Sequence, residues 1–454
     1  MGAPTPYIPN TGEDQAAILG ALDLPGVDAL FADLPARQLD PPLSLPPALD
    51  EAALAHLFER LAAQNAAGRD RPSFLGAGAY RRFVPAIVDH LASRSEFATA
   101  YTPYQPEISQ GTLQAAFEYQ STVCELTGME VSNTGLYDAG SATAEACLLS
   151  ARVTGRAALL LLEPIHPGTL DVVRTYALGA GLRVDTAPAG TALTAEHACV
   201  VIQQPDFLGA IVDVEPVAAA AHAAGALCVV VADPLTLGLL RAPGDAGADV
   251  VTGEGRDLAG PISFGGPSLG LFATRSAYLR QVPGRIVGRA KELHGPRRDD
   301  GSEGPPRTGY VLTLQAREQF IRRERATSNF STGQSLVAVA FTIAVQALGP
   351  AGLRSAAITC YQAAHDAARR IAALPGFEVV ERGPWFQEFL VRAPVAPLEL
   401  AARLREHGIA GGLPVDGRPE PECANATLFC VTEVTPHEHV DHLVQALATI
   451  GATP

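Results

Sequence analysis

The stretch that decides the fold runs from Val229 to Gly270 and reads VVVADPLTLGLLRAPGDAGADVVTGEGRDLAGPISFGGPSLG. It begins with a run of β-branched residues that ends at Asp233, and a second short strand is predicted at residues 248–252. A glycine-rich loop follows this second strand. Short apolar strands of this kind are typical of a parallel sheet covered on both faces. Ligands of such sheets bind at the carboxyl ends of the strands, where Asp233 is expected.

The same alternation of helices and short apolar strands extends outward over residues 71–345, which predicts one large α/β domain. Residues 1–70 are expected to form a peripheral helical and extended segment, and residues 346–454 a smaller α+β domain. The predicted strands of the large domain are Ala157–Leu162, Arg183–Asp185, Ala198–Gln203, Leu227–Ala232 and Ala248–Thr252.

Three local predictions concern the region between the two domains. A helix is predicted at residues 317–325, and the polar segment 289–307 is expected to be a mobile surface loop. The strongly apolar residues 336–348 are fewer than the roughly 20 that a membrane span needs. We therefore expect a helix that is buried on all sides, and no membrane as partner.

Composition narrows the choice of partner and compartment. The chain has 454 residues, a formal charge of −15 and 47% hydrophobic residues. An acidic balance argues against nucleic acid and against anionic membranes as partners. The seven cysteines show no CxxC spacing, and the N-terminus shows no secretion signal. These features favour buried, reduced thiols in the cytoplasm.

Two elements of the large domain suggest a cofactor site. A carboxylate at the position of Asp233 could keep a pyridine nitrogen protonated, as in one large class of pyridoxal-phosphate (PLP) enzymes. Gly140, Ser141 and Thr143 at a helix start could present N–H and hydroxyl groups to a phosphate. The ordinary alternatives are a turn cap beside Pro234 and a common Gly/Ser helix cap.

The position of the lysine decides the mechanism. In that enzyme class a lysine about two dozen residues after the aspartate forms the Schiff base with the cofactor. Here the corresponding position reads Gly255-Arg256-Asp257, and the only lysine, Lys291, lies in the polar segment. Arg256 cannot replace it, because a guanidinium stays protonated. We therefore do not expect covalent PLP catalysis by this chain alone.

A further group comprises Tyr101, Tyr104 and Glu107, in the sequence YTPYQPE before a predicted helix. Its prolines favour a rigid loop with polar tips, although a purely structural loop is an alternative. The sequence HEHVDH at residues 437–442 has the spacing of a metal-binding motif, but the preceding Pro436 and the acidic first turn favour a helix start. No metal site is predicted.

Several long segments together identify a resemblance that covers nearly the whole chain. The sequence resembles the P-protein family of the glycine cleavage system, and in particular the N-terminal (alpha) subunit of its split, two-subunit form. The segments are Tyr7–Thr11, Leu30–Pro35, Phe74–Tyr80, Tyr101–Glu107, Ser263–Pro267, Pro283–Gly288, Val311–Gln315 and Ile321–Asn329.

The resemblance implies a fold-type I PLP-transferase-like architecture, with a mostly parallel seven-stranded sheet and a smaller C-terminal α+β domain. It implies that a beta subunit carries the lysine and the PLP, and that this chain is inactive alone. The two subunits, as an alpha2-beta2 heterotetramer, would decarboxylate glycine and pass the aminomethyl group to the lipoyl arm of the H-protein.

The resemblance also assigns roles to candidate residues. Tyr101, Tyr104 and Glu107 are expected to line the glycine pocket. Thr327, Ser328 and Asn329 are expected to touch the phosphate of the partner's PLP. The remaining candidates form a vestigial cofactor site, namely Gly140, Ser141, Thr143, Asp233 and Arg256.

The sequence departs from the family pattern at two places. Arg256 stands where a neutral polar residue is expected, and we interpret it as a paired arginine; residues 330–333 also differ from the usual segment. Two rival functions are a stand-alone PLP enzyme and a purely structural partner of the PLP-bearing subunit.

Overall fold

The computed structural model describes residues 10–39, 41–65, 71–99 and 101–452. The chain divides into two units, residues 1–66 and residues 67–454, and each is described by itself. Residues 7–9 of the first family segment lie outside the described residues, as do residues 66–70 of the predicted N-terminal segment.

The first unit consists of short helices joined by extended chain. Helix α1 (Gly12–Ala21) begins at Thr11, whose side chain and backbone form a capping box with Asp14. Helix α2 (Glu51–Ala62) begins at Asp50, whose carboxylate accepts a hydrogen bond from the Ala53 amide at 2.8 Å. Two short 3₁₀ turns lie between them, at Val27–Phe31 and Ala36–Gln38. None of the described residues of this unit is buried.

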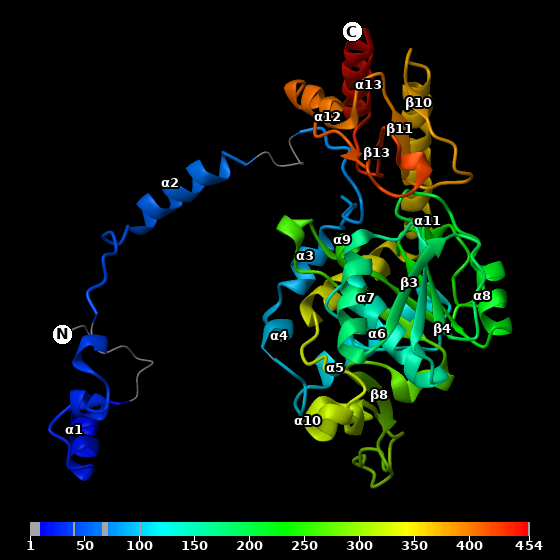
Figure 1. Cartoon of the computed structure of the whole chain (residues 1–454). Helices are drawn as coiled ribbons and strands as arrows, with labels where there is room; N and C mark the ends of the chain where they lie inside the picture. Colours follow the sequence, from blue (N-terminus) through cyan, green and yellow to red (C-terminus); the bar gives the residue numbers. More distant parts are fainter. Residues whose placement is uncertain (1–9, 40, 66–70, 100, 453–454) are drawn as a thin grey trace. The chain divides into compact units, whose positions relative to one another are not determined.

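The second unit is built on a seven-stranded sheet with the order β1-β7-β6-β5-β4-β2-β3 (Figure 1). Strands β3, β2, β4, β5 and β6 are parallel, whereas β7 runs antiparallel to β6 and β1 antiparallel to β7. The predicted mostly parallel sheet is therefore confirmed. The strands are β1 Val131–Ser132, β2 Ala158–Glu163, β3 Arg183–Pro188, β4 His197–Gln204, β5 Leu227–Ala232, β6 Val250–Glu254 and β7 Gly270–Thr274.

Both faces of this sheet are covered, and β5 shows why its sequence is apolar without alternation. Cys228 and Val230 pack into the core on one face, whereas Val229 and Val231 pack into the core on the other. Successive side chains of a strand point to opposite faces, so a strand buried on both must be continuously apolar. The helices of this domain are α3 Ile87–Ala92, α4 Ser95–Ala98, α5 Gln110–Thr127, α6 Ala139–Thr154, α7 Pro167–Ala180, α8 Val214–Ala223 and α9 Arg256–Ala259.

Helix α11 (Ser335–Ala372) joins the large sheet to the smaller domain. Gly349 bends it with a φ of 60°, just before Pro350. Its first half contributes Phe341 to the core on one face of the large sheet, and its second half contributes Ile371 to the core of the small domain. The predicted domain boundary at residue 346 falls inside this helix.

One described helix, α11, is long and apolar enough by length and composition to cross a membrane. Its packing into two cores accounts for this apolar character. The prediction that residues 336–348 are buried on all sides is wrong, because Leu336 is 49% exposed and Gln346 is also exposed. The helix buries one face only, as an amphipathic core helix does.

The smaller domain carries an antiparallel sheet with the order β10-β11-β13-β12. Figure 1 shows helices α12 and α13 beside it. The HEHVDH sequence forms the start of α13, as predicted. The elements are β10 Glu378–Val379, β11 Glu388–Arg392, α12 Pro397–Glu406, β12 Leu413–Pro414, β13 Ala426–Cys430 and α13 His437–Ala452.

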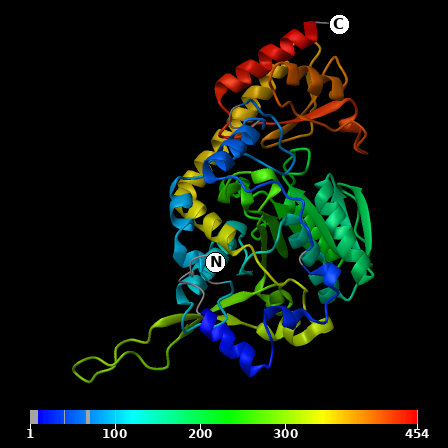
Figure 2. The ribbon, with the colours of Figure 1, turned by 90° about the vertical axis from the view of Figure 1, so that its left-hand side faces the viewer.

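Of two local predictions between the domains, one is largely confirmed and one is wrong. Residues 292–307 form a mostly exposed loop, as predicted, and only residues 289–291 belong to a strand. The loop connects β8 (Ile286–Lys291) and β9 (Thr308–Thr313) in a hairpin that projects from the large domain in Figure 2. The helix predicted at residues 317–325 is broken into short pieces, including α10 (Gln319–Arg322). Arg323 interrupts it with a φ of 52°, which a continuous helix does not allow.

Candidate functional site

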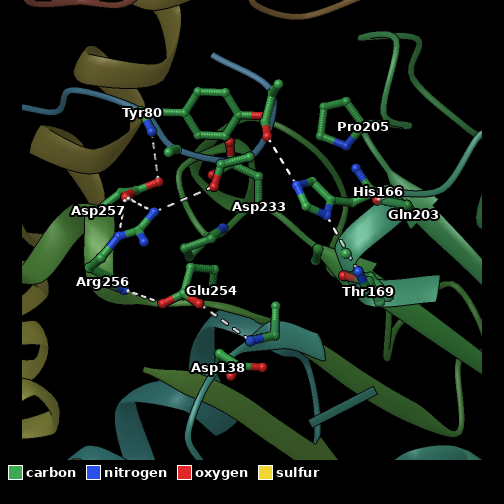
Figure 3. Close-up of a pocket in the computed structure, with 18 of the residues that line it drawn as sticks. Tyr80, Asp138, His166, Thr169, Gln203, Pro205, Asp233, Glu254, Arg256 and Asp257 are labelled. Atoms are coloured by element: carbon green, nitrogen blue, oxygen red, sulfur yellow. Dashed lines mark hydrogen bonds and ion pairs between the residues drawn. The ribbon is translucent and has the colours of Figure 1, made fainter. Parts of the chain in front are cut away.

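A cavity of about 440 Å³ lies at the carboxyl ends of the parallel strands, where the sheet type predicts a ligand. Gly140, Asp233 and Arg256 line it, so three of the five residues assigned to a vestigial site are brought together (Figure 3). Ser141 and Thr143 serve helix α6 instead. The Ser141 hydroxyl belongs to a capping box with Asp138, and the Thr143 hydroxyl donates to the Ala139 carbonyl at 2.7 Å.

Asp233 is already engaged by a cation from the chain itself. The Arg82 guanidinium donates to its carboxylate at 2.7 Å, and the Gln387 side-chain amide donates to the same oxygen at 3.2 Å. The Arg82 side chain is 1% exposed. The carboxylate that would hold a pyridine nitrogen therefore holds a buried arginine.

The N-terminus of α6, where a phosphate would bind, is occupied by two carboxylates (Figure 3). Asp138 accepts from the Ser141 amide at 2.7 Å, and Glu254 accepts from the Ala139 amide at 3.3 Å. The other oxygen of Glu254 accepts from the amides of Arg256 and Leu269. Burial raises the pKa of Glu254 to about 7.

Arg256 is paired, as its place in a vestigial site suggests. Its guanidinium donates to the Asp257 carboxylate at 2.9 Å, and it also reaches the Gly78 carbonyl at 3.5 Å. Asp257 in turn accepts from the Tyr80 amide at 3.1 Å. Arg256 and its neighbour therefore hold the segment that begins at Phe74.

That segment, residues 74–83, contributes to the lining of the cavity and is bound to both domains. Glu388 of β11 accepts from the Ala77 amide at 2.6 Å and from the Tyr80 hydroxyl at 2.7 Å. Glu433 accepts from the Phe83 amide at 2.7 Å, and the His166 ring hydrogen-bonds to the Ala77 carbonyl at 3.1 Å. The polar groups of the cavity are thus largely satisfied by this segment.

The residues present do not fit PLP. The described cavity has no lysine, its aspartate is paired with Arg82, and Glu254 and Asp138 place negative charge where a phosphate would sit. Placing a phosphate beside these carboxylates is electrostatically unfavourable. No catalytic step is assigned to this cavity.

Four residues that organise the cavity were not singled out from the sequence: Arg82, His166, Glu254 and Glu388. Residues 74–80 carry part of the family resemblance, but nothing in their pattern indicates that they line a cofactor site. A glutamate at the end of an apolar strand, such as Glu254, is the one available signal, because a charged residue there must find a partner.

The pH dependence of stability is expected to change when Glu388 is replaced by glutamine. Burial raises the pKa of Glu388 from 4.5 to about 7, so the folded chain binds a proton that the unfolded chain releases. The protonated Glu388 therefore adds about 3 kcal/mol to the free energy of unfolding below about pH 4.5, and this stabilisation is lost as the pH rises to about 7. Denaturant midpoints of E388Q measured from pH 5 to pH 8 should therefore vary less than those of the wild type.

The exposed Glu125→Gln is the matched control for this measurement. It should leave the slope of stability against pH unchanged. An E388Q slope equal to that of the wild type would show that Glu388 is ionised in the folded state.

The two groups of residues expected to reach a partner lie in neighbouring segments. The Tyr101 hydroxyl hydrogen-bonds to the Thr332 hydroxyl at 2.9 Å, which places the loop of residues 101–107 against residues 327–333. Tyr101 is 77% exposed and Tyr104 is 52% exposed. The side chains of Glu107 and Asn329 are also exposed.

Buried polar atoms without a hydrogen-bond partner gather near this face. Of the four such side-chain atoms in the described chain, one is on Thr102, between the two tyrosines. A second is on Arg285, whose guanidinium donates to the Tyr104 hydroxyl, and a third is on Glu145, which accepts from the Ser328 hydroxyl. An unsatisfied buried polar group costs about 1–3 kcal/mol, so each of these atoms needs a hydrogen-bond partner, which a water or another molecule can supply.

The comparisons with known proteins agree on one family. Residues 5–447 match the family described as "Glycine cleavage system P-protein". Two relatives are both named "Probable glycine dehydrogenase (decarboxylating) subunit 1". The protein of Desulfitobacterium hafniense is 44% identical, over 98% of this chain and 99% of the relative. The protein of Thermomicrobium roseum is 45% identical, over 97% of this chain and 98% of the relative.

Solved structures show the same relationship. A crystal structure of glycine decarboxylase (P-protein) of the glycine cleavage system, in inhibitor-bound form, superposes with a TM-score of 0.87 at 40% identity, over 98% of this chain and 100% of that chain. A sphingosine-1-phosphate lyase of Burkholderia pseudomallei superposes with a TM-score of 0.61 at 15% identity, over 92% of this chain and 95% of that chain. This likeness shows the shared fold alone. The chain belongs to the glycine cleavage system P-protein family.

Proposed function

We propose that this chain is the subunit of a heteromeric glycine decarboxylase that carries no cofactor lysine and completes the active site of a second, PLP-bearing subunit. One observation carries the proposal. The Asp233 carboxylate of the chain's own cofactor site is paired with Arg82, and no described lysine lines that cavity, whereas the loop of residues 101–107 is exposed and lies against residues 327–333. The names of the relatives, which call them subunit 1, support a second subunit as partner.

In this proposal PLP, held by the second subunit, supplies the electron sink that the decarboxylation of glycine requires. This chain supplies polar groups around it. Tyr101, Tyr104 and Glu107 orient glycine through hydroxyl and carboxylate contacts, and the exposed rings help to exclude water. The Thr327 hydroxyl and the Asn329 amide donate to the cofactor's phosphate, while the Ser328 hydroxyl, which donates to Glu145, holds this segment in place.

The remaining parts of the proposal concern the assembly. The subunits form an alpha2-beta2 heterotetramer in the cytoplasm, and the aminomethyl group passes to the lipoyl arm of the H-protein. The acidic charge of −15 and the unpaired cysteines support a soluble assembly in a reducing compartment.

Reconstitution tests the proposal directly. The chain is copurified with a lysine-bearing P-protein subunit, and glycine–bicarbonate exchange is measured with and without it. Exchange should require both subunits, and Tyr104→Phe and Glu107→Gln should each lower it about tenfold or more, as the loss of a hydrogen bond to a charged group does. Tyr361→Phe and Glu125→Gln are matched controls that should leave exchange unchanged.

Two results separate this proposal from its rivals. Unchanged exchange in both the Y104F and the E107Q complexes would support a purely structural partner. Full exchange by the lysine-bearing subunit alone would contradict the proposal altogether. Visible absorbance from cofactor bound to this chain in isolation would instead support a stand-alone PLP enzyme.

A further inference from the structure

We propose that Arg285 forms an oxyanion subsite of the shared active site and binds a carboxylate or phosphate group presented there. The inference rests on the proposed function and adds a residue and a ligand chemistry to it. Two observations support it: the backbone around Arg285 is held by hydrogen bonds, and most N–H donors of its guanidinium have no hydrogen-bond partner among the described residues.

The backbone around Arg285 is fixed at every carbonyl. The four carbonyl oxygens of residues 282–285 all accept hydrogen bonds from side chains or amides of other segments. The Arg317 guanidinium donates to the carbonyls of Val282 and Gly284. The Asn133 side chain donates to the Pro283 carbonyl at 3.0 Å, and the Thr134 amide donates to the Arg285 carbonyl at 3.0 Å. Asn133 is fully buried. Such a backbone holds one side-chain direction, as a preorganised binding group requires.

The guanidinium itself is mostly unpaired. Its side chain is 15% exposed, and within the described residues its one hydrogen bond goes from Nη2 to the Tyr104 hydroxyl at 3.3 Å. The Nε atom is buried and makes no hydrogen bond. The Glu318 carboxylate lies 3.9 Å from Nε, close enough for attraction but too far for a hydrogen bond.

The chemistry of these donors selects the ligand. A guanidinium is a planar fork with five N–H donors and matches the paired oxygens of a carboxylate or a phosphate. Desolvation raises the pKa of Glu318, and the charges of Arg285 and Arg317 oppose that rise. The guanidinium carbon of Arg285 lies 5.5 Å from the centroid of the Tyr104 ring, which covers one side of it.

Two oxyanions are expected at this face: the carboxylate of glycine and the phosphate of the cofactor in the second subunit. Arg285→Gln is introduced into the reconstituted complex, with Arg285→Lys as a second variant. The matched control is Arg289→Gln, an exposed arginine in β8, the strand that follows Arg285. The Michaelis constant for glycine and the PLP concentration for half-maximal reactivation are measured by glycine–bicarbonate exchange.

The R285Q complex should show a rise of about tenfold or more in one of these two constants, as expected for a lost charge-assisted hydrogen bond. A raised Michaelis constant with normal PLP reactivation assigns the subsite to the glycine carboxylate. A raised PLP requirement assigns it to the phosphate. The R285K complex should lie between R285Q and the wild type, because a lysine keeps the charge but loses the fork.

The inference and the proposed function fail in different ways. If R285Q leaves both constants as in R289Q while the wild-type complex is active, the oxyanion subsite is wrong and the proposed function stands. If R285Q does not assemble with its partner on gel filtration, R285K decides, and wild-type constants in R285K overturn the inference. An inactive wild-type complex contradicts the proposed function itself.

Discussion

Replacing Arg82 by methionine is expected to destabilise the folded chain by about 3–5 kcal/mol. The Arg82 side chain is 1% exposed and pairs with Asp233 at 2.7 Å and with Glu433 at 3.3 Å. Removing the guanidinium leaves two buried carboxylates without a cation, and that desolvation penalty is the source of the loss. Denaturant unfolding of the purified chain measures it.

A matched pair on the surface provides the control. Arg241 contacts Glu215 at the same 2.7 Å, but these side chains are 57% and 67% exposed. Arg241→Met should cost less than about 1 kcal/mol, because water screens an exposed ion pair. The double variant R82M/D233N should be more stable than R82M alone, since it removes one of the stranded charges. Equal losses for R82M and R241M would contradict the interpretation.

A second large effect is expected for Gly209→Ala, at about 2–5 kcal/mol. Gly209 has a φ of 94°, and an added Cβ would overlap the backbone carbonyl oxygen of Glu388. The two segments pair here, since the Phe386 amide donates to the Gly209 carbonyl at 3.1 Å. The substitution therefore pushes apart the loop after β4 and the start of β11. Loss of unfolding free energy measures the effect.

Gly190→Ala separates the two causes of this loss. Gly190 has a similar φ of 87°, but an added Cβ there would meet no atom within 4 Å. Its variant reports the backbone cost of a left-handed residue alone, about 1–2 kcal/mol. A G209A loss no larger than that of G190A would mean that the contact with β11 relaxes freely.

Both substitutions alter the lining of the cavity at the carboxyl ends of the strands. Arg82 and its segment bind Asp233 of the large domain and Glu388 and Glu433 of the small domain. The lining of this cavity therefore ties two domains together.

The sequence was sufficient for several conclusions. Continuous apolar strands around Asp233 predict a doubly covered parallel sheet, since alternate side chains of a buried strand reach both cores. The single lysine lies away from Gly255-Arg256-Asp257, which predicts that this chain forms no covalent bond to PLP, because a lysine amine forms the required bond. The long matching segments identified the family, and the comparisons confirm it.

Only the tertiary structure decided which residues line the predicted cofactor site and which polar groups near Tyr101 and Tyr104 remain unpaired. Asp233 meets Arg82 across a sequence separation of 151 residues, and the side chain of Tyr104 meets Arg285 across 181. Local propensity carries no information about such contacts, because they depend on how whole elements pack. The break at Arg323 has the same origin: the pattern favours a helix, but the packed chain adopts a left-handed residue there. Composition and periodicity thus determined the sheet and its helices, whereas long-range packing determined which charged side chains pair with one another.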